Sequence, residues 1–284
     1  MPSGVLLSFI VPAYNAEKFL FFSVGSAIAQ KIPNSEIVIV NDASNDATEN
    51  VCRHLQRRYR DYPIIYATNT KNLGGGATRN KCLELAHGEF IFNLDADNVI
   101  PKGLLAKLLD GVETLSETAR SSVMITPAVI QYFQRQRVVF GTEIRKLRHK
   151  WIYESVSPTF VYLNPITPAS SGNYLYAHKI AESVGGHFVD CGAYDAWSFG
   201  IRCYTAGYRY KIVKETFYLH RLHSESYWST GQRVGANRLG LYNAVRHFED
   251  IYSDETLKTL HPNNPHYPDD PFGCLILRHD SVTL

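Results

Sequence analysis

The first 115 residues alternate short apolar segments with segments of helical periodicity. The apolar segments, four to six residues long, cover 6–11, 36–40, 64–67 and 90–94. The helical patterns cover 16–30, 47–59, 77–86 and 104–115. Short strands separated by helices of about 10–15 residues are typical of β-α-β units. The sequence therefore predicts an α/β fold with a mostly parallel central sheet and helices on both of its faces.

The pattern changes after about residue 120. Residues 123–133 and 138–140 are predicted to be strands of a small antiparallel element, and loops rich in Ser, Pro and Asn continue to Gly172. The elements expected after these loops are helices at 178–184, 193–206 and 240–248, with a strand at 208–213. Four prolines between 262 and 271 predict an extended tail.

Composition excludes several classes of protein. Of the 284 residues 45% are hydrophobic, which excludes global disorder, and the net charge of +2 gives no sign of a nucleic-acid partner. No run of ~18 apolar residues occurs, so no ordinary transmembrane helix is expected. The first residues lack a basic segment, and Pro12 interrupts their apolar run, as in a first strand rather than a signal peptide. We therefore expect a cytoplasmic protein.

Cysteine spacing and local charge add two expectations. The five cysteines lie far apart without a Cys-x-x-Cys pair, which indicates buried free thiols and does not favour a zinc site. The segment 135–150 contains six Lys or Arg residues and one Glu. It is either a solvated face or a patch that faces an anionic acceptor or a membrane surface, so peripheral membrane contact is possible.

Small and polar residues follow each of the four apolar segments, at 12–15, 41–46, 72–80 and 95–98. In an open parallel sheet, ligands bind beyond the carboxyl ends of the strands. One such segment could be ordinary turn chemistry. Four of them at successive strand ends predict the rim of a ligand-binding site.

Asp95 and Asp97 are the sharpest feature of this rim. Two carboxylates two residues apart on an extended segment point the same way, and a hard divalent cation relieves their repulsion and can also hold phosphate oxygens. The alternative is a helix-capping Asp beside a turn Asp. Because a buried apolar strand precedes the pair, we favour a site for Mn²⁺ or Mg²⁺.

Gly74, Gly75 and Gly76 form an unhindered loop at the start of a predicted helix. Backbone N–H groups at such a place can meet a phosphate or a sugar, with Arg79 as a nearby cation. The pattern is not Gly-x-Gly-x-x-Gly and has no P-loop lysine, so a dinucleotide fold and a P-loop are disfavoured. An EF-hand starting at Asp42 is excluded because Ala47 stands where glycine is required.

These motifs resemble the family 2 inverting glycosyltransferases, which have the GT-A fold. The resemblance rests on F-I-V-P-A-Y-N at 9–15, I-V-I-V-N-D-A-S-N-D-A-T at 37–48, N-L-G-G-G-A-T-R-N at 72–80 and G-E-F-I-F-N-L-D-A-D at 88–97. Segments at 173–176, 184–190 and 194–197 extend it to about residues 5–228. It implies a GT-A domain at 1–228, with a nucleotide-sugar-binding half at 1–115, an acceptor and catalytic half at 116–228, and a C-terminal extension at 229–284.

The resemblance also implies roles for single residues. Asp97 would hold the cation with His223, or with His220 as the alternative ligand. Asp42 would accept a hydrogen bond from the base or ribose, and Arg221 would contact the diphosphate. The full set of implied donor-binding residues is Pro12, Ala13, Tyr14, Asn15, Asp42, Gly75, Arg79, Asp95, Ala96 and Arg221.

Asp195 is the implied base that deprotonates the acceptor. The family usually has Glu-Asp before a Trp, and here Tyr194 replaces the Glu. The family also often has Phe directly after Gly-Gly, and here His187 intervenes, which leaves Asp190 as a rival base.

The implied reaction is metal-dependent transfer of a hexosyl group, with inversion, from a nucleoside-diphosphate sugar to a hydroxyl of a glycan or lipid-linked acceptor. UDP is favoured as the carrier, with dTDP and GDP as alternatives. Two other functions stay open: a catalytically inactive nucleotide- or glycan-binding protein, and a sugar nucleotidyltransferase. The second is less favoured because it needs a glycine-rich loop where this chain has 12–15.

Overall fold

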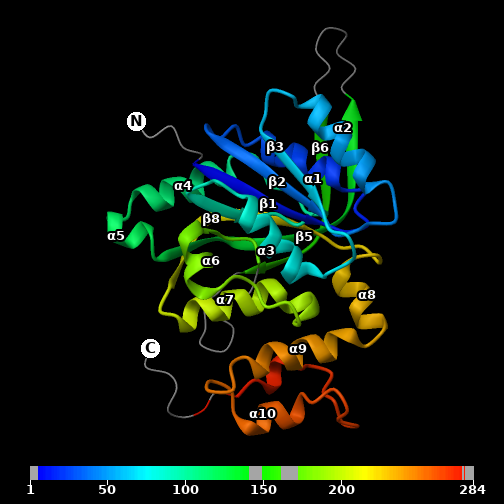
Figure 1. The fold of residues 1–284 in the computed structure, drawn as a ribbon, viewed down its shortest axis with the longest axis vertical. Helices are drawn as coiled ribbons and strands as arrows, with labels where there is room; N and C mark the ends of the chain where they lie inside the picture. Colours follow the sequence, from blue (N-terminus) through cyan, green and yellow to red (C-terminus); the bar gives the residue numbers. More distant parts are fainter. Residues whose placement is uncertain (1–5, 141–148, 161–171, 277, 279–284) are drawn as a thin grey trace.

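The computed structural model describes residues 6–140, 149–160, 172–276 and 278 (Figure 1). The elements along these residues are β1 (Leu7–Ala13), α1 (Leu20–Ile28), β2 (Ser35–Asn41), α2 (Thr48–Arg58), β3 (Ile64–Thr68), α3 (Gly75–Leu85), β4 (Phe90–Asn93), α4 (Leu104–Glu113), α5 (Glu117–Arg120), β5 (Val123–Phe140), β6 (His149–Phe160), β7 (Leu175–Ala177), α6 (His178–Val184), η1 (Gly192–Tyr194), α7 (Asp195–Thr205), β8 (Arg209–Arg221), α8 (Tyr227–Arg233), α9 (Ala236–Arg246), α10 (Asp254–Thr259) and η2 (Phe272–Cys274).

One eight-stranded sheet organises the described chain, in the order β3-β2-β1-β4-β7-β5-β6, with β8 paired to β5. The pairs β1–β2, β1–β4, β2–β3 and β5–β8 are parallel. β7 is antiparallel to β4 and β5, and β6 is antiparallel to β5. β1 to β5 and β8 therefore run in the same direction, so their carboxyl ends face the same edge of the sheet. The predicted α/β fold, mostly parallel with an antiparallel portion, is confirmed.

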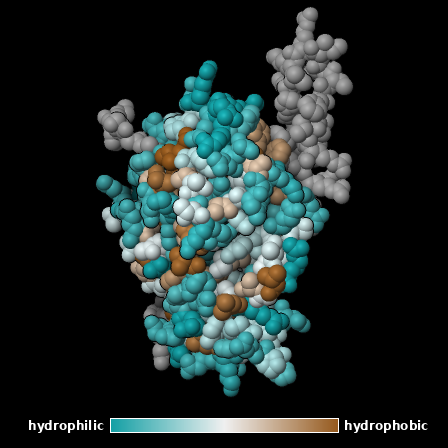
Figure 2. All heavy atoms as spheres, turned by 45° about the vertical axis from the view of Figure 1, so that its right-hand side comes forward, coloured by the Kyte–Doolittle hydropathy of each residue, from teal (hydrophilic) through white to brown (hydrophobic). Residues whose placement is uncertain are grey.

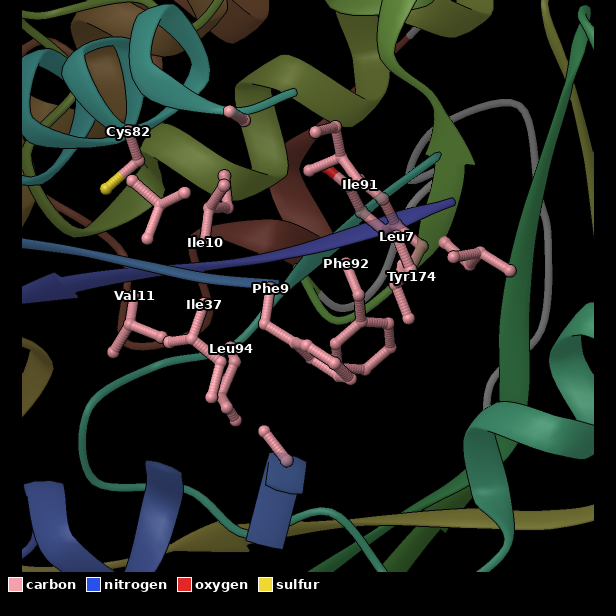
Figure 3. Close-up of a cluster of buried hydrophobic side chains, with 14 of the residues drawn as sticks. Leu7, Phe9, Ile10, Val11, Ile37, Cys82, Ile91, Phe92, Leu94 and Tyr174 are labelled. Atoms are coloured by element: carbon pink, nitrogen blue, oxygen red, sulfur yellow. The ribbon is translucent and has the colours of Figure 1, made fainter. Parts of the chain in front are cut away.

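The hydrophobic core lies between the sheet and two helical layers. Helices α3, α6 and α7 cover one face of the sheet, and α1, α2 and α4 cover the other. Every residue of β2 is buried, which explains why residues 37–40 are all apolar rather than alternating with polar ones. Phe9 and Phe92, on neighbouring strands, lie edge to face with ring centroids 6.1 Å apart (Figure 3). Full burial of each such side chain contributes about 1.5–3 kcal/mol.

The antiparallel element is longer than expected. β5 is one continuous strand through 134–137, and its pairing with β6 forms the hairpin. The prediction of two separate strands at 123–133 and 138–140 was wrong. The polar residues 134–137 have no strand pattern in the sequence, but they continue the strand because β6 pairs with it. β8 is also longer than expected and extends to Arg221. The predicted basic patch at 135–150 lies outside the side chains that the structure describes.

The C-terminal helices pack onto the sheet domain through a second hydrophobic cluster. Cys191, just before η1, contributes to it with Tyr194 of η1 and Trp197 of α7, and Leu241 and Phe248 contribute from α9 and the turn after it. In Figure 1, α9 lies next to α7 on the side away from the sheet, and α10 lies beyond α9. The predicted boundary at 228/229 falls inside α8. The division into domain and extension therefore stays a prediction.

Surface polarity is mixed on the face drawn in Figure 2, where apolar residues form small groups on a mostly hydrophilic surface. Within the described ranges, no helix has both the length and the apolar character that crossing a bilayer requires.

Candidate active site

Asp42 follows β2 and fixes the glycine loop before α3. Its carboxylate is 3% exposed and accepts hydrogen bonds from the N–H of Leu73 (2.9 Å) and Gly74 (2.8 Å) and from the amide of Asn69 (2.7 Å). Both oxygens of Asp42 thus orient the loop in this structure. The expected contact of Asp42 with a base or ribose stays a prediction.

Arg79 connects three parts of the chain at the carboxyl-end edge of the sheet. From α3, its guanidinium donates to Oδ2 of Asp195 and to Oδ1 of Asp95, each at 2.5 Å. The side chain of Arg79 is 11% exposed and that of Asp195 is 6% exposed. Sequence analysis predicted all three residues for the site, and the structure brings them into direct contact.

Burial and charge set the protonation states of this cluster. Burial opposes the charged form of Arg79, but the carboxylates of Asp195 and Asp95 outweigh burial, and the pKa of Arg79 is raised. Burial also raises the pKa of Asp195, while the charge of Arg79 and the N–H of Ala196 act in the opposite direction. A carboxyl group with a raised pKa suits a general base that works near neutral pH.

Gly75 and Gly76 allow α3 to approach the rest of the site closely. A Cβ on Gly75 would overlap Oδ2 of Asp195, and a Cβ on Gly76 would overlap the carbonyl oxygen of Phe188. The carboxylate of Asp195 therefore lies beside the N-terminus of α3, where the helix dipole favours a negative charge. The predicted place of Gly75 at the site agrees with this geometry.

Gly76→Ala is expected to destabilise the protein by at least about 2 kcal/mol, because the overlapping atom belongs to a backbone that cannot rotate away. The matched control is Gly25→Ala in α1, where the nearest atom to the new Cβ is 3.9 Å away. That substitution should stabilise the protein by about 0.5–1 kcal/mol. Urea unfolding of both variants measures the difference, and equal effects would show that the close approach is not rigid.

Asp97 and His223 form the second part of the site. Nε2 of His223 lies 2.9 Å from Oδ2 of Asp97, and the imidazole packs on Phe19 with ring centroids 4.4 Å apart. Nδ1 of His223 is buried and has no hydrogen-bond partner among the described residues. A carboxylate oxygen and an imidazole nitrogen this close can bind one divalent cation together. These residues fit the predicted cation.

Asn98 and Arg221 hold the segment that contains Asp95 and Asp97 in place at the end of β8. The amide nitrogen of Asn98 donates to Oδ2 of Asp95 at 3.0 Å, and its Oδ1 accepts from the N–H of Arg221 at 2.8 Å. Nε of Arg221 donates to the carbonyl of Asp97 at 2.8 Å, and its guanidinium lies over the rings of Phe19 and Phe133. Arg221 thus positions Asp97, and its contact with a diphosphate stays a prediction.

His220 has different partners from His223. Its Nδ1 lies 3.2 Å from the amide nitrogen of Asn98, and its ring packs on Tyr132. The structure therefore favours His223 over His220 as the residue that would share a cation with Asp97. Ala96, between the two aspartates, is buried, and the carbonyl of Asp95 accepts from Ser23.

The segment after β1 lies beside the segment after β2. Asn15 has a positive φ of 48°, accepts from the N–H of Asn45 and donates its own N–H to Ser44. Ala13 is buried, Pro12 is partly buried and Tyr14 is 48% exposed. Tyr14 is therefore exposed at this edge, and the carbonyl of Ala13 accepts from the N–H of Asp42 at 2.8 Å. The contact of these residues with a donor stays a prediction.

The loop that follows α6 separates the two rival bases. Asn80 of α3 forms a reciprocal pair with the backbone of His187, at 2.7 and 2.9 Å. The ring of His187 stacks on Phe199 and contacts the carbonyl of Asp195. Asp190 instead lies 2.8 Å from Nε2 of His247, beyond α9. Of the two rival bases, Asp195 therefore contacts Arg79 and Asp190 contacts His247.

His187 makes the stability of this loop depend on pH. Burial, followed by the charge of Arg79, lowers the pKa of His187 to about 3. In the unfolded chain His187 binds a proton near pH 6.5, whereas in the folded chain it stays neutral until a much lower pH. The free energy of unfolding therefore decreases as the pH falls through 6.5. Between pH 7 and 5 the loss from this residue is about 2 kcal/mol. In urea unfolding, the free energy of unfolding of His187→Leu should fall by about 2 kcal/mol less between pH 7 and pH 5 than that of the parent. The control His266→Leu, at an exposed position, should match the parent.

Three residues of the site were not predicted as site residues. Asn80 and Asn98 lie in the polar segments 72–80 and 95–98, but only their contacts across the fold reveal what they hold. Tyr227, at the start of α8, is 54% exposed, and its hydroxyl lies near Gly74 and Gly192. Burial and the charges of Asp195 and Asp42 raise the pKa of Tyr227, so its hydroxyl is close enough to interact electrostatically with these two carboxylates. No local sequence pattern distinguished it.

Comparison with known sequences decides the family. Residues 8–182 match the sequence model described as "Glycosyl transferase family 2". The chain belongs to glycosyl transferase family 2. A family relative described as an uncharacterized glycosyltransferase of Methanocaldococcus jannaschii is 26% identical over 264 residues, which cover 92% of this chain and 81% of that protein. With several other relatives, only about a third of the chain aligns, and it then spans 41% or less of their length.

Solved structures show the same family fold. A mannosyltransferase from Pyrobaculum calidifontis, in complex with GDP-Man and Mn²⁺, superposes with a TM-score of 0.60 at 20% identity, over 84% of this chain and 64% of that one. S. aureus TarS 1–349, in complex with UDP-GlcNAc, superposes with a TM-score of 0.59 at 17% identity, over 84% of this chain and 66% of that one. The chain thus spans just under two thirds of these structures.

Proposed function

We propose that this protein transfers a hexosyl group, with inversion, from a nucleoside-diphosphate sugar to a hydroxyl of a glycan or lipid-linked acceptor. The observation that carries the proposal is the buried bridge from Asp195 through Arg79 to Asp95, beside the glycine loop. The structural neighbours that hold UDP-GlcNAc and GDP-Man support a nucleotide-sugar donor. UDP is the favoured carrier, with GDP and dTDP as alternatives.

Asp195 is the proposed base. It would take the proton of the acceptor hydroxyl as that oxygen attacks the anomeric carbon, and a single displacement inverts this centre. Burial is the first cause of its raised pKa, and a higher pKa makes the carboxylate a stronger proton acceptor. The glycine loop that Asp42 orients would present N–H groups to the diphosphate at the N-terminus of α3.

Asp97 and His223 would hold Mn²⁺ or Mg²⁺. The cation, when bound, neutralises the charge that develops on the leaving nucleoside diphosphate. Arg221 and Asn98 would keep Asp97 and Asp95 in place from the β8 side. Residues 1–115 would bind the donor, residues 116–228 would supply the base and the acceptor side, and residues 229–284 would be an extension.

Incubation with UDP-, GDP- and dTDP-sugars and Mn²⁺, with a panel of glycan acceptors, tests the function through release of nucleoside diphosphate. Asp97→Ala should lose most of this release, whereas Asp110→Ala, an exposed carboxylate on α4, should keep it. Release of pyrophosphate instead would favour a nucleotidyltransferase. Binding of a donor without any product would favour an inactive binding protein.

A further inference from the structure

A second group of metal-ligating side chains lies away from the Asp97 site, where the loop after α6 meets α9. Asp190 and Cys191 belong to the loop, and His247 follows the last residue of α9. One oxygen of Asp190, Sγ of Cys191 and one ring nitrogen of His247 all lie within 4.8 Å of one another. Nε2 of His247 is 2.8 Å and Sγ of Cys191 is 3.6 Å from Oδ1 of Asp190.

We propose that Asp190, Cys191 and His247 form a binding site for a thiophilic divalent cation of the zinc class. The donors are one oxygen, one sulfur and one nitrogen, which is a ligand set that Zn²⁺ accepts in tetrahedral coordination. Ligand atoms of such a site lie roughly 3.3–3.8 Å apart, so a side-chain shift of about an ångström completes the geometry. The proposal does not depend on the proposed sugar transfer.

The surroundings of the triad supply both support and access. Phe188 stacks on the imidazole of His247 with ring centroids 3.8 Å apart, and Asn243 donates to the carbonyl of Asp190 at 2.9 Å. Such contacts orient ligands before a cation arrives. The side chains of Asp190 and His247 are 49% and 33% exposed, so an ion can enter and a water can serve as the fourth ligand.

Ligand chemistry separates this site from the one at Asp97. A thiolate selects soft or borderline cations, whereas the oxygen-rich rim around Asp95 and Asp97 suits Mn²⁺ and Mg²⁺. Burial raises the pKa of the Cys191 thiol to about 12, so the cation has to displace a thiol proton when it binds. Once bound, it would fix α9 to the loop that leads into Asp195.

Titration of the full chain with Co²⁺, in excess Mg²⁺ and with the thiols kept reduced, tests the site through thiolate-to-cobalt absorption. The parent should bind one Co²⁺ with this absorption, and stoichiometric Zn²⁺ should remove it. Cys191→Ser should abolish the absorption. The controls Asp97→Asn and Cys274→Ser should keep it, since Cys274 is the partly exposed cysteine. Absence of the absorption in the parent, or its persistence in Cys191→Ser, would overturn the proposal.

His247→Gln is a second test, which is needed because substitution of the buried Cys191 could itself disturb folding. It should weaken Co²⁺ binding by at least about tenfold, because it removes a direct ligand, and loss of even an outer contact to a ligand usually costs about 10–100-fold in affinity. Zn²⁺ should raise the melting temperature of the parent and of Asp97→Asn but not that of His247→Gln. If Zn²⁺ raises all three melting temperatures equally, the three residues do not bind the cation, and Asp190 and His247 form an ion pair only.

Discussion

Asp195→Asn is expected to lower the rate of sugar transfer by about 10²–10⁴-fold, the usual contribution of a positioned general base. Asn keeps an oxygen that can accept from the N–H of Ala196, so the start of α7 should persist. It removes the group that would take the proton of the acceptor and one of the two negative charges that pair with Arg79, which keeps Asp95 as its ionic partner. Donor binding should therefore change little, because the glycine loop and the Asp97 pair are untouched.

Transfer rates with a saturating donor, together with calorimetric nucleotide binding, measure this effect. The informative comparison is Asp190→Asn, the rival base, which is expected to lose less than about tenfold because Asp190 contacts His247 and not Arg79. Equal losses in the two variants, or near-normal turnover in Asp195→Asn, would contradict the assignment of the base.

Arg79→Met is expected to destabilise the protein by about 3–5 kcal/mol at pH 8. Removing one partner of a buried ion pair leaves the other charges uncompensated. Here both Asp195 and Asp95 lose their shared cation. The cost should shrink as the pH falls, because burial already raises the pKa of Asp195 and protonation then removes its charge.

Arg53→Met is the matched control. Arg53 forms a pair with Glu49 one turn away on α2, and both side chains are at least half exposed. Exposed pairs of this kind contribute about 0.2–1 kcal/mol, so this substitution should cost less than about 1 kcal/mol. Chemical denaturation at pH 8 and pH 5 checks both variants. A cost for Arg79→Met similar to that for Arg53→Met would mean that water screens the cluster.

The first half of the fold was predictable because its signals are local. Strands that are buried on both faces are mostly apolar, and the connection between parallel strands is usually a helix, so β1, β2 and β4 follow from residue order alone. The hairpin was less predictable. The polar run at 134–137 gives no strand pattern, and only pairing with β6 makes it a strand.

The order of residues by itself determined the α/β class, the strand ends that carry the polar residues, and the family resemblance. The tertiary structure alone showed that Arg79 joins Asp195 to Asp95, that His223 rather than His220 meets Asp97, and that Asp190 faces α9. The physical reason is sequence separation. Arg79 and Asp195 are 116 positions apart, and Asp97 and His223 are 126 apart, so their contacts depend on sheet packing and not on any local pattern.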